Sequence, residues 1–341
     1  MSKTLLNALD RPALIIAADG RISAANAPAI DLLGDAILGR HYITALRQPS
    51  LLDAIEHVEK TGEKVEARYL TTEARRDITM TAHCAALKPD DGIFVLFEDH
   101  TAVEEAEQIR RDFVANVSHE LRTPLTALLG FIETLQGAAK NDPESQARFL
   151  DIMKREAGRM NRLVGDLLSL SRVEAEARVR PTDEVDLASV ARSVAVSLGP
   201  VAKEAGVDLV LNGADGTCIV PGDADQLSQV VTNLVENGVK YSSAGAKVTV
   251  ELRDEDHNAM VRGRAAVISV TDTGEGIDPI HIPRLTERFY RIDNHRSREL
   301  GGTGLGLAIV KHIINRHRGR LRIESKLEKG SRFTVILPAA V

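Results

Sequence analysis

Two amides, an ammonium group and a phenol fall on one face of a predicted helix. The residues at i, i+4, i+7 and i+8 of that helix are Asn233, Asn237, Lys240 and Tyr241. Asparagine carbonyls are hard oxygen ligands of the kind that Mg²⁺ prefers, and phosphates supply the remaining ligands and charge. The face therefore predicts a site for a Mg²⁺–triphosphate. A solvated polar helix face has the same pattern and is the alternative at this point.

Two glycine clusters follow further along the chain. Gly274 and Gly276 lie two and four positions after Asp272, which follows a predicted strand. The second cluster opens a predicted helix and contains Gly302, Gly304 and Gly306. Glycines let a backbone approach phosphates closely, and a helix N-terminus presents N–H groups to anions. Neither cluster ends in the Gly-Lys-Ser/Thr of a Walker A loop, and the first lacks the parallel βαβ unit of a dinucleotide fingerprint. Ordinary turns are the alternative.

A histidine and a glutamate, His119 and Glu120, lie in a long predicted helix. Its apolar stripe recurs at steps of three or four, at Ile109, Phe113, Val117, Leu121, Leu125, Leu128, Ile132 and Leu135. At about 100° per residue, the ring of His119 points away from this stripe. A solvated helix histidine fits the pattern, but Pro124 is expected to kink the helix and to present the imidazole to a second domain.

Three successive segments of the chain differ in their pattern of expected helices and strands, which indicates a multidomain α+β protein. Residues 1–100 mix strands with helices expected at 31–38 and 49–60, which predicts an antiparallel sheet. Residues 101–175 predict two long amphipathic helices, the second starting at an Asp142 N-cap. Such a hairpin cannot bury its stripe alone, so we expect a dimeric four-helix bundle. Residues 185–341 alternate helices and strands and predict an α/β sandwich; the preceding charged segment, 174–181, is expected to be a linker.

Composition narrows the function classes. The chain has 341 residues, enough for two or three domains, and its net charge of −6 disfavours nucleic-acid binding. Only two cysteines are present, Cys84 and Cys218, which excludes a disulfide framework and indicates a reducing compartment. The longest apolar runs are strand-sized, far below the about 20 residues of a transmembrane helix. We therefore expect a soluble, cytoplasmic protein.

The order of these motifs resembles that of two-component sensor histidine kinases. A His-Glu-Leu-Arg-Thr-Pro segment, the Asn-x-x-x-Asn-x-x-Lys-Tyr helix, Asp-x-Gly-x-Gly, Phe289-Tyr290-Arg291 and Gly-x-Gly-x-Gly correspond to the family's H, N, G1, F and G2 boxes. The resemblance covers residues 110–341. Three segments together are most similar to the phosphate-regulon subgroup of this family: the H-box segment, Leu168 to Arg172, and Glu287 to Arg291. Residues 1–100 resemble a PAS sensor module.

The resemblance implies a role for each motif residue. His119 would be the phospho-acceptor, and Glu120 would hydrogen-bond its ring or take its proton. Thr123, one turn later, would orient the water that hydrolyses the phospho-aspartate of a response regulator. Asn237 would ligate Mg²⁺, and Asp272 would accept a hydrogen bond from the adenine amino group. The remaining ATP-binding residues would be Asn233, Lys240, Tyr241, Gly274, Gly276, Arg291, Gly302, Gly304 and Gly306.

Two departures from the family pattern concern the lid and the input. Thr286 stands where the family usually has a phenylalanine, which is expected to loosen lid packing. The subgroup usually carries transmembrane helices and this sequence shows none, so the input would be a cytoplasmic cue or a membrane-associated partner, or the chain is a truncated version. The implied partners are a second copy of the chain and a cognate response regulator, with phosphate-starvation signalling as the expected setting.

Two alternative functions are compatible with the same nucleotide-binding fold. An ATPase of the gyrase–Hsp90–MutL type would lack the phospho-acceptor helix and would place a glutamate at Asn233. A pseudokinase or phosphatase-biased scaffold would tolerate loss of Asn237, Asp272 and the glycines, all of which are present.

Overall fold

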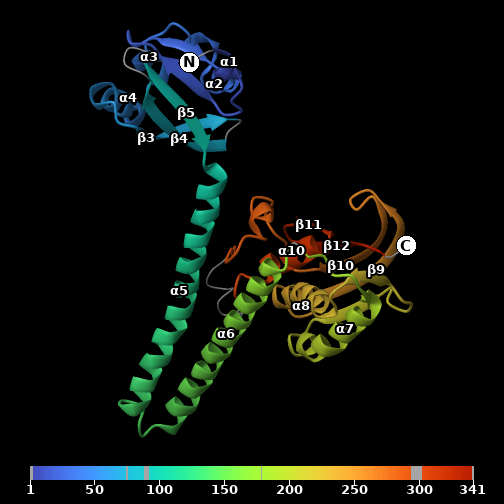
Figure 1. Ribbon diagram of the computed structural model, residues 1–341. Coiled ribbons are helices and arrows are strands. Elements are labelled where there is room, and N and C mark those ends of the chain that lie inside the picture. Colours follow the sequence, from blue (N-terminus) through green and yellow to red (C-terminus); the bar gives the residue numbers. More distant parts are fainter. Residues whose placement is uncertain (1–2, 74–75, 88–91, 178, 293–301, 340–341) are drawn as a thin grey trace. The chain divides into compact units, whose positions relative to one another are not determined.

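The computed structural model describes residues 3–73, 76–87, 92–177, 179–292 and 302–339 (Figure 1). Contacts within the chain divide it into two compact units, Met1–Ala115 and Asn116–Val341. The long helix α5 (Thr101–Gln136) begins in the first unit and ends in the second. No helix among the described residues is long and apolar enough to cross a membrane.

The first unit is built on a five-stranded antiparallel sheet, as the alternating apolar runs predict. The strand order is β2-β1-β5-β4-β3. The strands are β1 (Ala13–Ile16), β2 (Ile22–Ala25), β3 (Val65–Glu73), β4 (Arg76–Ala86) and β5 (Ile93–Asp99). The helix α4 (Pro49–Thr61) packs against β3, β4 and β5, and its Ile55 joins Phe97 in the core. Burial alternates along β5, which is the period-two pattern of a half-buried strand.

The helix expected at residues 31–38 is wrong in its bounds. The structure forms α2 (Ala27–Leu33) and then, after Gly34, the short 3₁₀ helix η1 (Asp35–Ile37). The start is earlier because the buried Asn26 caps the helix, its side-chain oxygen accepting from the Ala29 amide at 3.0 Å. The break comes at Gly34, whose φ of 88° a helix cannot hold. The other helices of this unit are α1 (Lys3–Asn7) and α3 (Tyr42–Leu46).

The predicted helical hairpin is present as α5 and α6 (Pro143–Ala175). Asp142 is the N-cap of α6, as predicted, and its carboxylate accepts from the amides of Glu144 and Ser145 at 3.1 and 3.2 Å. α5 continues as a helix through Pro124, whose side chain is buried. In Figure 1 both helices extend from the short loop that joins them.

The C-terminal part is an α/β sandwich, as the alternating elements predict. Its main sheet has the order β11-β12-β10-β9-β7, in which only the β7–β9 pair is parallel, and β6 pairs with β8. The strands are β6 (Asp183–Asp186), β7 (Asp208–Asn212), β8 (Ile219–Gly222), β9 (Lys247–Asn258), β10 (Gly263–Asp272), β11 (Arg320–Lys326) and β12 (Gly330–Pro338). The helices are α7 (Leu187–Glu204), α8 (Ala224–Lys240), η2 (Ile282–Arg284) and α10 (Gly306–Arg316).

The sandwich and the hairpin are joined by packing as well as by the chain. α10 packs against both α6 and α8, and α8 packs on β9 and β10 (Figure 1). The predicted linker is partly helical, because α6 runs to Ala175. Glu174, in its last turn, forms an ion pair with Arg288 of the sandwich.

Candidate functional site

The polar face of α8 lies against the start of α10. The Asn233 side-chain amide donates to the Gly306 carbonyl at 3.3 Å, while Leu234 and Val235 on the other side of the helix are buried. Asn237 is half-buried one turn further on. The structure thus places the first residues of the predicted Mg²⁺–triphosphate face beside the last glycine of the second cluster.

Lys240 and Tyr241 end this face at the C-terminus of α8. The Lys240 ammonium lies 5.0 Å from the centre of the Tyr241 ring. Burial lowers the pKa of Lys240, because the charged form has lost part of its hydration. A partly desolvated ammonium gains more from an incoming phosphate than a solvated one, so its position favours anion binding.

Asp272 is buried at the end of β10. Its side chain is held through one oxygen, Oδ1, which accepts from the amides of Gly274 at 2.9 Å and Ser331 at 3.2 Å. Burial raises the pKa of Asp272, although these hydrogen bonds oppose the shift. A carboxylate fixed through Oδ1 presents its second oxygen in a defined direction, as recognition of a base amino group requires.

Glycine is required at both positions of the first cluster, because backbone atoms of other segments lie too close for a side chain. Gly276 has a φ of 73°, and a Cβ there would lie 2.0 Å from the Lys326 carbonyl oxygen. At Gly274 a Cβ would lie 2.8 Å from the carbonyl oxygen of Tyr241. The cluster therefore brings the end of β10 against the end of α8, which joins Asp272 to the Lys240–Tyr241 end of the polar face.

The second glycine cluster meets the segment that contains Phe289. The Phe289 amide donates to the Gly304 carbonyl at 2.8 Å, and Gly304 has a φ of 74°. Gly302 lies two positions before Gly304, and residues 293–301, which directly precede the cluster, lie outside the described residues. Thr286, the departure from the family pattern, accepts a hydrogen bond from the Lys311 ammonium of α10 at 3.3 Å.

His119 is exposed on α5, as predicted, and Thr123 lies one turn after it. The Thr123 hydroxyl donates to the His119 carbonyl oxygen at 3.1 Å, which ties the two residues into one turn. Both side chains are exposed. The arrangement leaves the imidazole accessible from solvent and the hydroxyl on the same side of the helix.

Glu120 faces inward and meets two arginines. Arg159 of α6 donates a hydrogen bond to its Oε2, and Nη1 of Arg291 lies 3.8 Å from the same oxygen. Arg291, expected at the phosphates, is therefore placed against Glu120, with only 6% of its side chain exposed. Sequence reasoning missed Arg159; its signal was a charged residue one helical turn before the apolar Leu163, which is also buried.

A threonine of the second glycine cluster also contacts α6. The Thr303 hydroxyl donates to Asp166 Oδ2 at 2.6 Å. Burial raises the pKa of Asp166, opposed by this hydrogen bond. Asp166 and Glu174 were not singled out from the sequence, because both lie in an amphipathic helix where acidic residues are ordinary.

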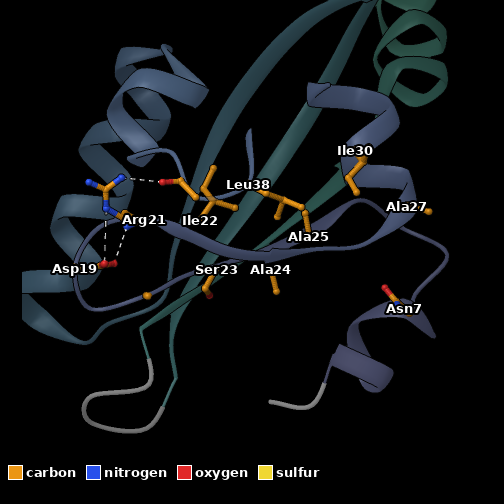
Figure 2. Close-up of a pocket in the computed structure, with 12 residues that line it drawn as sticks. Asn7, Asp19, Arg21, Ile22, Ser23, Ala24, Ala25, Ala27, Ile30 and Leu38 are labelled. Atoms are coloured by element: carbon orange, nitrogen blue, oxygen red, sulfur yellow. Dashed lines mark hydrogen bonds and ion pairs between the residues drawn. The ribbon is translucent and has the colours of Figure 1, made fainter. Parts of the chain in front are cut away.

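A shallow hollow of about 660 Å³ lies in the first unit beside β2 (Figure 2). Its charged lining residues are engaged with one another. Arg21 donates through Nη1 to the Gly39 carbonyl at 2.8 Å and through its amide to Asp19 at 3.0 Å. These contacts hold the β1–β2 turn together, so they do not mark a ligand site.

Two family models match the chain. Residues 109–176 match the His Kinase A (phospho-acceptor) domain. Residues 222–341 match the histidine kinase-, DNA gyrase B- and HSP90-like ATPase family. The first match contains His119 and most of the hairpin, from residue 109 on, and the second contains the α8 face, Asp272 and both glycine clusters.

Curated relatives align over most of the chain. The sensor-like histidine kinase SenX3 of Mycolicibacterium smegmatis is 38% identical over 291 residues, covering 84% of this chain and 73% of the relative. The phosphate regulon sensor protein PhoR of Pseudomonas aeruginosa is 43% identical over 242 residues, covering 70% and 52%. The sensor histidine kinase WalK of Bacillus subtilis is 34% identical over 329 residues, covering 94% and 52%. The chain thus spans about half the length of PhoR and WalK.

Among the solved structures that are similar to this chain is a histidine kinase whose alignment covers its whole length. Histidine kinase ThkA, in complex with response regulator protein TrrA, aligns with a TM-score of 0.54 and 22% identity, covering 100% of this chain and 99% of that one. At this identity the likeness supports the fold alone.

Proposed function

The chain belongs to the sensor histidine kinases, and we propose that it transfers the γ-phosphoryl group of ATP to His119 and then to an aspartate of a response regulator. The observation that carries this proposal is that three of the predicted ATP-binding motifs lie next to one another in the fold. The α8 face, Asp272 and the start of α10 meet through the contacts of Gly274 and Gly306, which are distant in sequence.

The donor set suits ATP bound together with Mg²⁺. Asn237 offers an amide oxygen and Asn233 lies close by, whereas no acidic or histidine cluster among the described residues could hold a metal ion alone. The ion would therefore arrive with the phosphates, which supply most of its ligands and charge. Bound Mg²⁺ would neutralise charge on the phosphates during transfer, while Lys240 and the amides at the start of α10 bind the same groups.

Adenine would bind near Asp272, with Tyr241 lining the site. The Asp272 carboxylate, fixed through Oδ1, would accept a hydrogen bond from the adenine amino group. A guanine presents a carbonyl at that position, so the same carboxylate would reject GTP.

The neutral imidazole of His119 would attack the γ-phosphorus in line. The new N–P bond forms as the bond to the ADP oxygen breaks, and the proton on the other ring nitrogen passes to the Glu120 carboxylate. Thr123 would support the opposing phosphatase activity, by orienting a water that hydrolyses the phospho-aspartate of the response regulator. Both outputs would be selected by the conformation of the hairpin.

The hairpin is proposed to be the dimerisation element. Large apolar side chains remain exposed along α5 and α6, including Leu125, Leu129, Leu150 and Leu168 at 49%, 54%, 56% and 68%. A second copy would cover this stripe and complete a four-helix bundle. The working division of the chain is then a PAS-like sensor at 1–100, the hairpin at 101–175 and the ATP-binding domain at 185–341.

The input is proposed to reach His119 through α5. The antiparallel sheet of the first unit and its inserted helices support a PAS-like module, and α5 continues directly from it. The similarity to PhoR supports phosphate-starvation signalling, with a membrane-associated partner as the source of the input.

Labelling with γ-labelled ATP and Mg²⁺ tests the proposal. Acid-labile, base-stable label is expected on the full chain and none on His119→Ala. His57→Ala, which removes another exposed histidine, is the matched control and should label normally. Label that persists in His119→Ala, or a wild-type chain that binds and hydrolyses ATP without becoming labelled, would reject the phospho-acceptor assignment.

A further inference from the structure

His83 of β4 lies between two carboxylates on the face of the first sheet that is turned away from α4. Its neighbours Ala82 and Cys84 are buried in the core on the α4 side, and successive strand residues face opposite sides of a sheet. On the other face, His83 Nδ1 lies 3.2 Å from Oε1 of Glu66 on β3, and Nε2 lies 3.2 Å from Oε2 of Glu98 on β5. One imidazole thus bridges three neighbouring strands.

Only the charged imidazolium satisfies both of these contacts. A neutral imidazole carries one N–H and one lone pair, so it donates to one carboxylate and turns its lone pair toward the other. The imidazolium donates through both nitrogens, and both hydrogen bonds are then charge-assisted. Histidine side chains ordinarily change charge between about pH 5 and 8, where glutamates are ordinarily ionised. The bridge between Glu66 and Glu98 through His83 therefore depends on pH.

Glu98 is shared by three basic side chains. Its Oε1 lies 2.9 Å from Nη1 of Arg11, which stays charged throughout this pH range. Its Oε2 faces His83 and also His100, whose Nε2 lies 3.6 Å away. Together with Glu66, the cluster has two carboxylates and one permanent cation, so the first proton taken up by a histidine makes it neutral. Loss of that proton leaves excess negative charge around Glu98, which is only 29% exposed.

His100 connects this cluster to α5. It is the one residue between the end of β5 and the start of α5. Its amide donates to the Thr79 carbonyl at 3.0 Å, and its carbonyl accepts from the Glu104 amide in the first turn of α5 at 2.8 Å. The Glu104 carboxylate also pairs with Arg68 of β3 at 2.8 Å. A change in the pairing of the His100 side chain therefore acts on the first turn of the helix that carries His119.

We propose that His83, His100 and Glu98 form a proton-sensitive switch at the β5–α5 junction, which biases the output of the kinase. At the acid end of the histidine range, the two imidazolium rings hold Glu98 between β4 and the junction. As pH rises through that range the protons leave, and each ring keeps at most one N–H to donate. The effect on output rests on the proposed function, whereas the change at the junction does not. Protons would thus act on the same helix as any input from a partner.

Hydrogen exchange of the full chain at about pH 6 and about pH 8, with EDTA present to remove metal ions, tests the change at the junction. The readouts are the amides of His100 and Glu104, with rates corrected for the pH dependence of unprotected amides. Their protection is expected to be roughly two- to fivefold higher at the lower pH, which is the range of an exposed ion pair. His83→Gln and His100→Gln, which replace the ring by a neutral amide, should each reduce this difference, and the double variant should remove it.

His57→Gln is the matched control, because His57 is an exposed histidine on α4 of the same unit. Its junction should respond to pH as that of wild type does. A pH difference in protection that persists in the double variant, the absence of any difference in wild type, or an equal loss of the difference in His57→Gln would overturn the proposal.

Parallel assays of autophosphorylation and of phospho-regulator hydrolysis at the same two pH values test the consequence for output. The kinase-to-phosphatase ratio of wild type is divided by that of the double variant at each pH, so that the pH dependence of the shared chemistry cancels. This quotient should change by about two- to fivefold, in either direction, between the two pH values. A constant quotient beside a responsive junction would overturn the link to the kinase.

If the double variant does not fold, Glu98→Gln decides, because it keeps both histidines and removes the charge that they share. An undiminished pH response of the junction in that variant overturns the proposal, and a flattened response upholds it. A responsive junction in a wild-type chain that takes no label on His119 rejects the proposed function and leaves the change at the junction standing. A labelled wild type whose junction ignores pH overturns this inference alone.

Discussion

The Phe289 amide donates a 2.8 Å hydrogen bond to the carbonyl oxygen of Gly304. Both residues have positive φ values, 63° for Phe289 and 74° for Gly304. A phenylalanine in the left-handed region is uncommon, so the surrounding packing must hold it there. The contact ties Phe289 to the residues that directly precede α10 and thereby fixes the start of α10, where phosphates are proposed to bind.

Gly304→Ala is expected to weaken ATP binding. A Cβ at this position would lie 2.9 Å from Phe289 Cα, and the left-handed backbone adds strain of about 1–2 kcal/mol for a residue with a Cβ. Gly245→Ala is the control, because Gly245 also has a positive φ, of 85°, but open space around it. Titration of a fluorescent ATP analogue should show weaker binding only for Gly304→Ala. Equal effects of the two variants on affinity would mean that the Phe289 contact has no part in the site.

Asp272→Asn is expected to lower ATP affinity while the fold is kept. The asparagine can still accept at Oδ1 from Gly274 and Ser331, but its NH₂ group replaces the oxygen proposed to face adenine. Loss of a hydrogen bond to a charged group costs about 1.5–3 kcal/mol, which corresponds to roughly 10- to 100-fold in affinity. Competition with ATP and GTP measures the effect, and the preference for ATP should shrink. Asp254→Asn, at an exposed position paired with Arg264, should leave both affinities unchanged.

The lowered pKa of Lys240 predicts a pH dependence of ATP binding at alkaline pH. Only the protonated ammonium attracts phosphates, and burial places its pKa below the ordinary 10.5 in the free chain. Bound phosphates raise that pKa again. Affinity should therefore be full below the lowered value, fall as pH rises between the free and bound values, and be accompanied by proton uptake in this window. Calorimetric titration in buffers of different ionisation enthalpy measures the uptake.

Lys240→Met is the control for that titration. The variant should bind ATP more weakly at neutral pH and show no proton uptake from this site. If the alkaline loss of affinity persists unchanged in the methionine variant, another group is responsible for it.

Inserting one residue after Glu105 is expected to change the ratio of kinase to phosphatase output. α5 starts at the sheet, where the Thr101 hydroxyl accepts from the Thr79 amide at 3.0 Å, and it continues without interruption through His119. One extra residue rotates every later position by about 100° relative to that anchor. Parallel assays of autophosphorylation and of phospho-regulator hydrolysis give the ratio.

A seven-residue insertion at the same place is the matched control. It lengthens the helix but restores its phase to within about 20°. The ratio should stay closer to that of wild type than after the single insertion. Identical ratios for wild type and the one-residue variant would argue against signal transfer by rotation of α5.

Features that depend on near neighbours could be predicted from the sequence. The α8 face follows from residues at i, i+4 and i+7, the Asp142 cap from the residues directly after it, and the exposure of His119 from the stripe on either side. The edge strand β11 (Arg320–Lys326) likewise alternates charged residues with Leu321 and Ile323, which is the period-two pattern of a half-buried strand.

Only the tertiary structure decided which distant side chains meet. Glu120 pairs with Arg159, Asp166 accepts from Thr303, and Asn233 reaches Gly306, across separations of 39, 137 and 73 residues. Helical and strand periodicity fixes which face a residue occupies, but it does not fix which face of another element packs against it. That choice depends on the path of the intervening chain and on the packing of the whole unit, so a charged residue such as Arg159 looks like any other surface arginine until α5 and α6 are placed side by side.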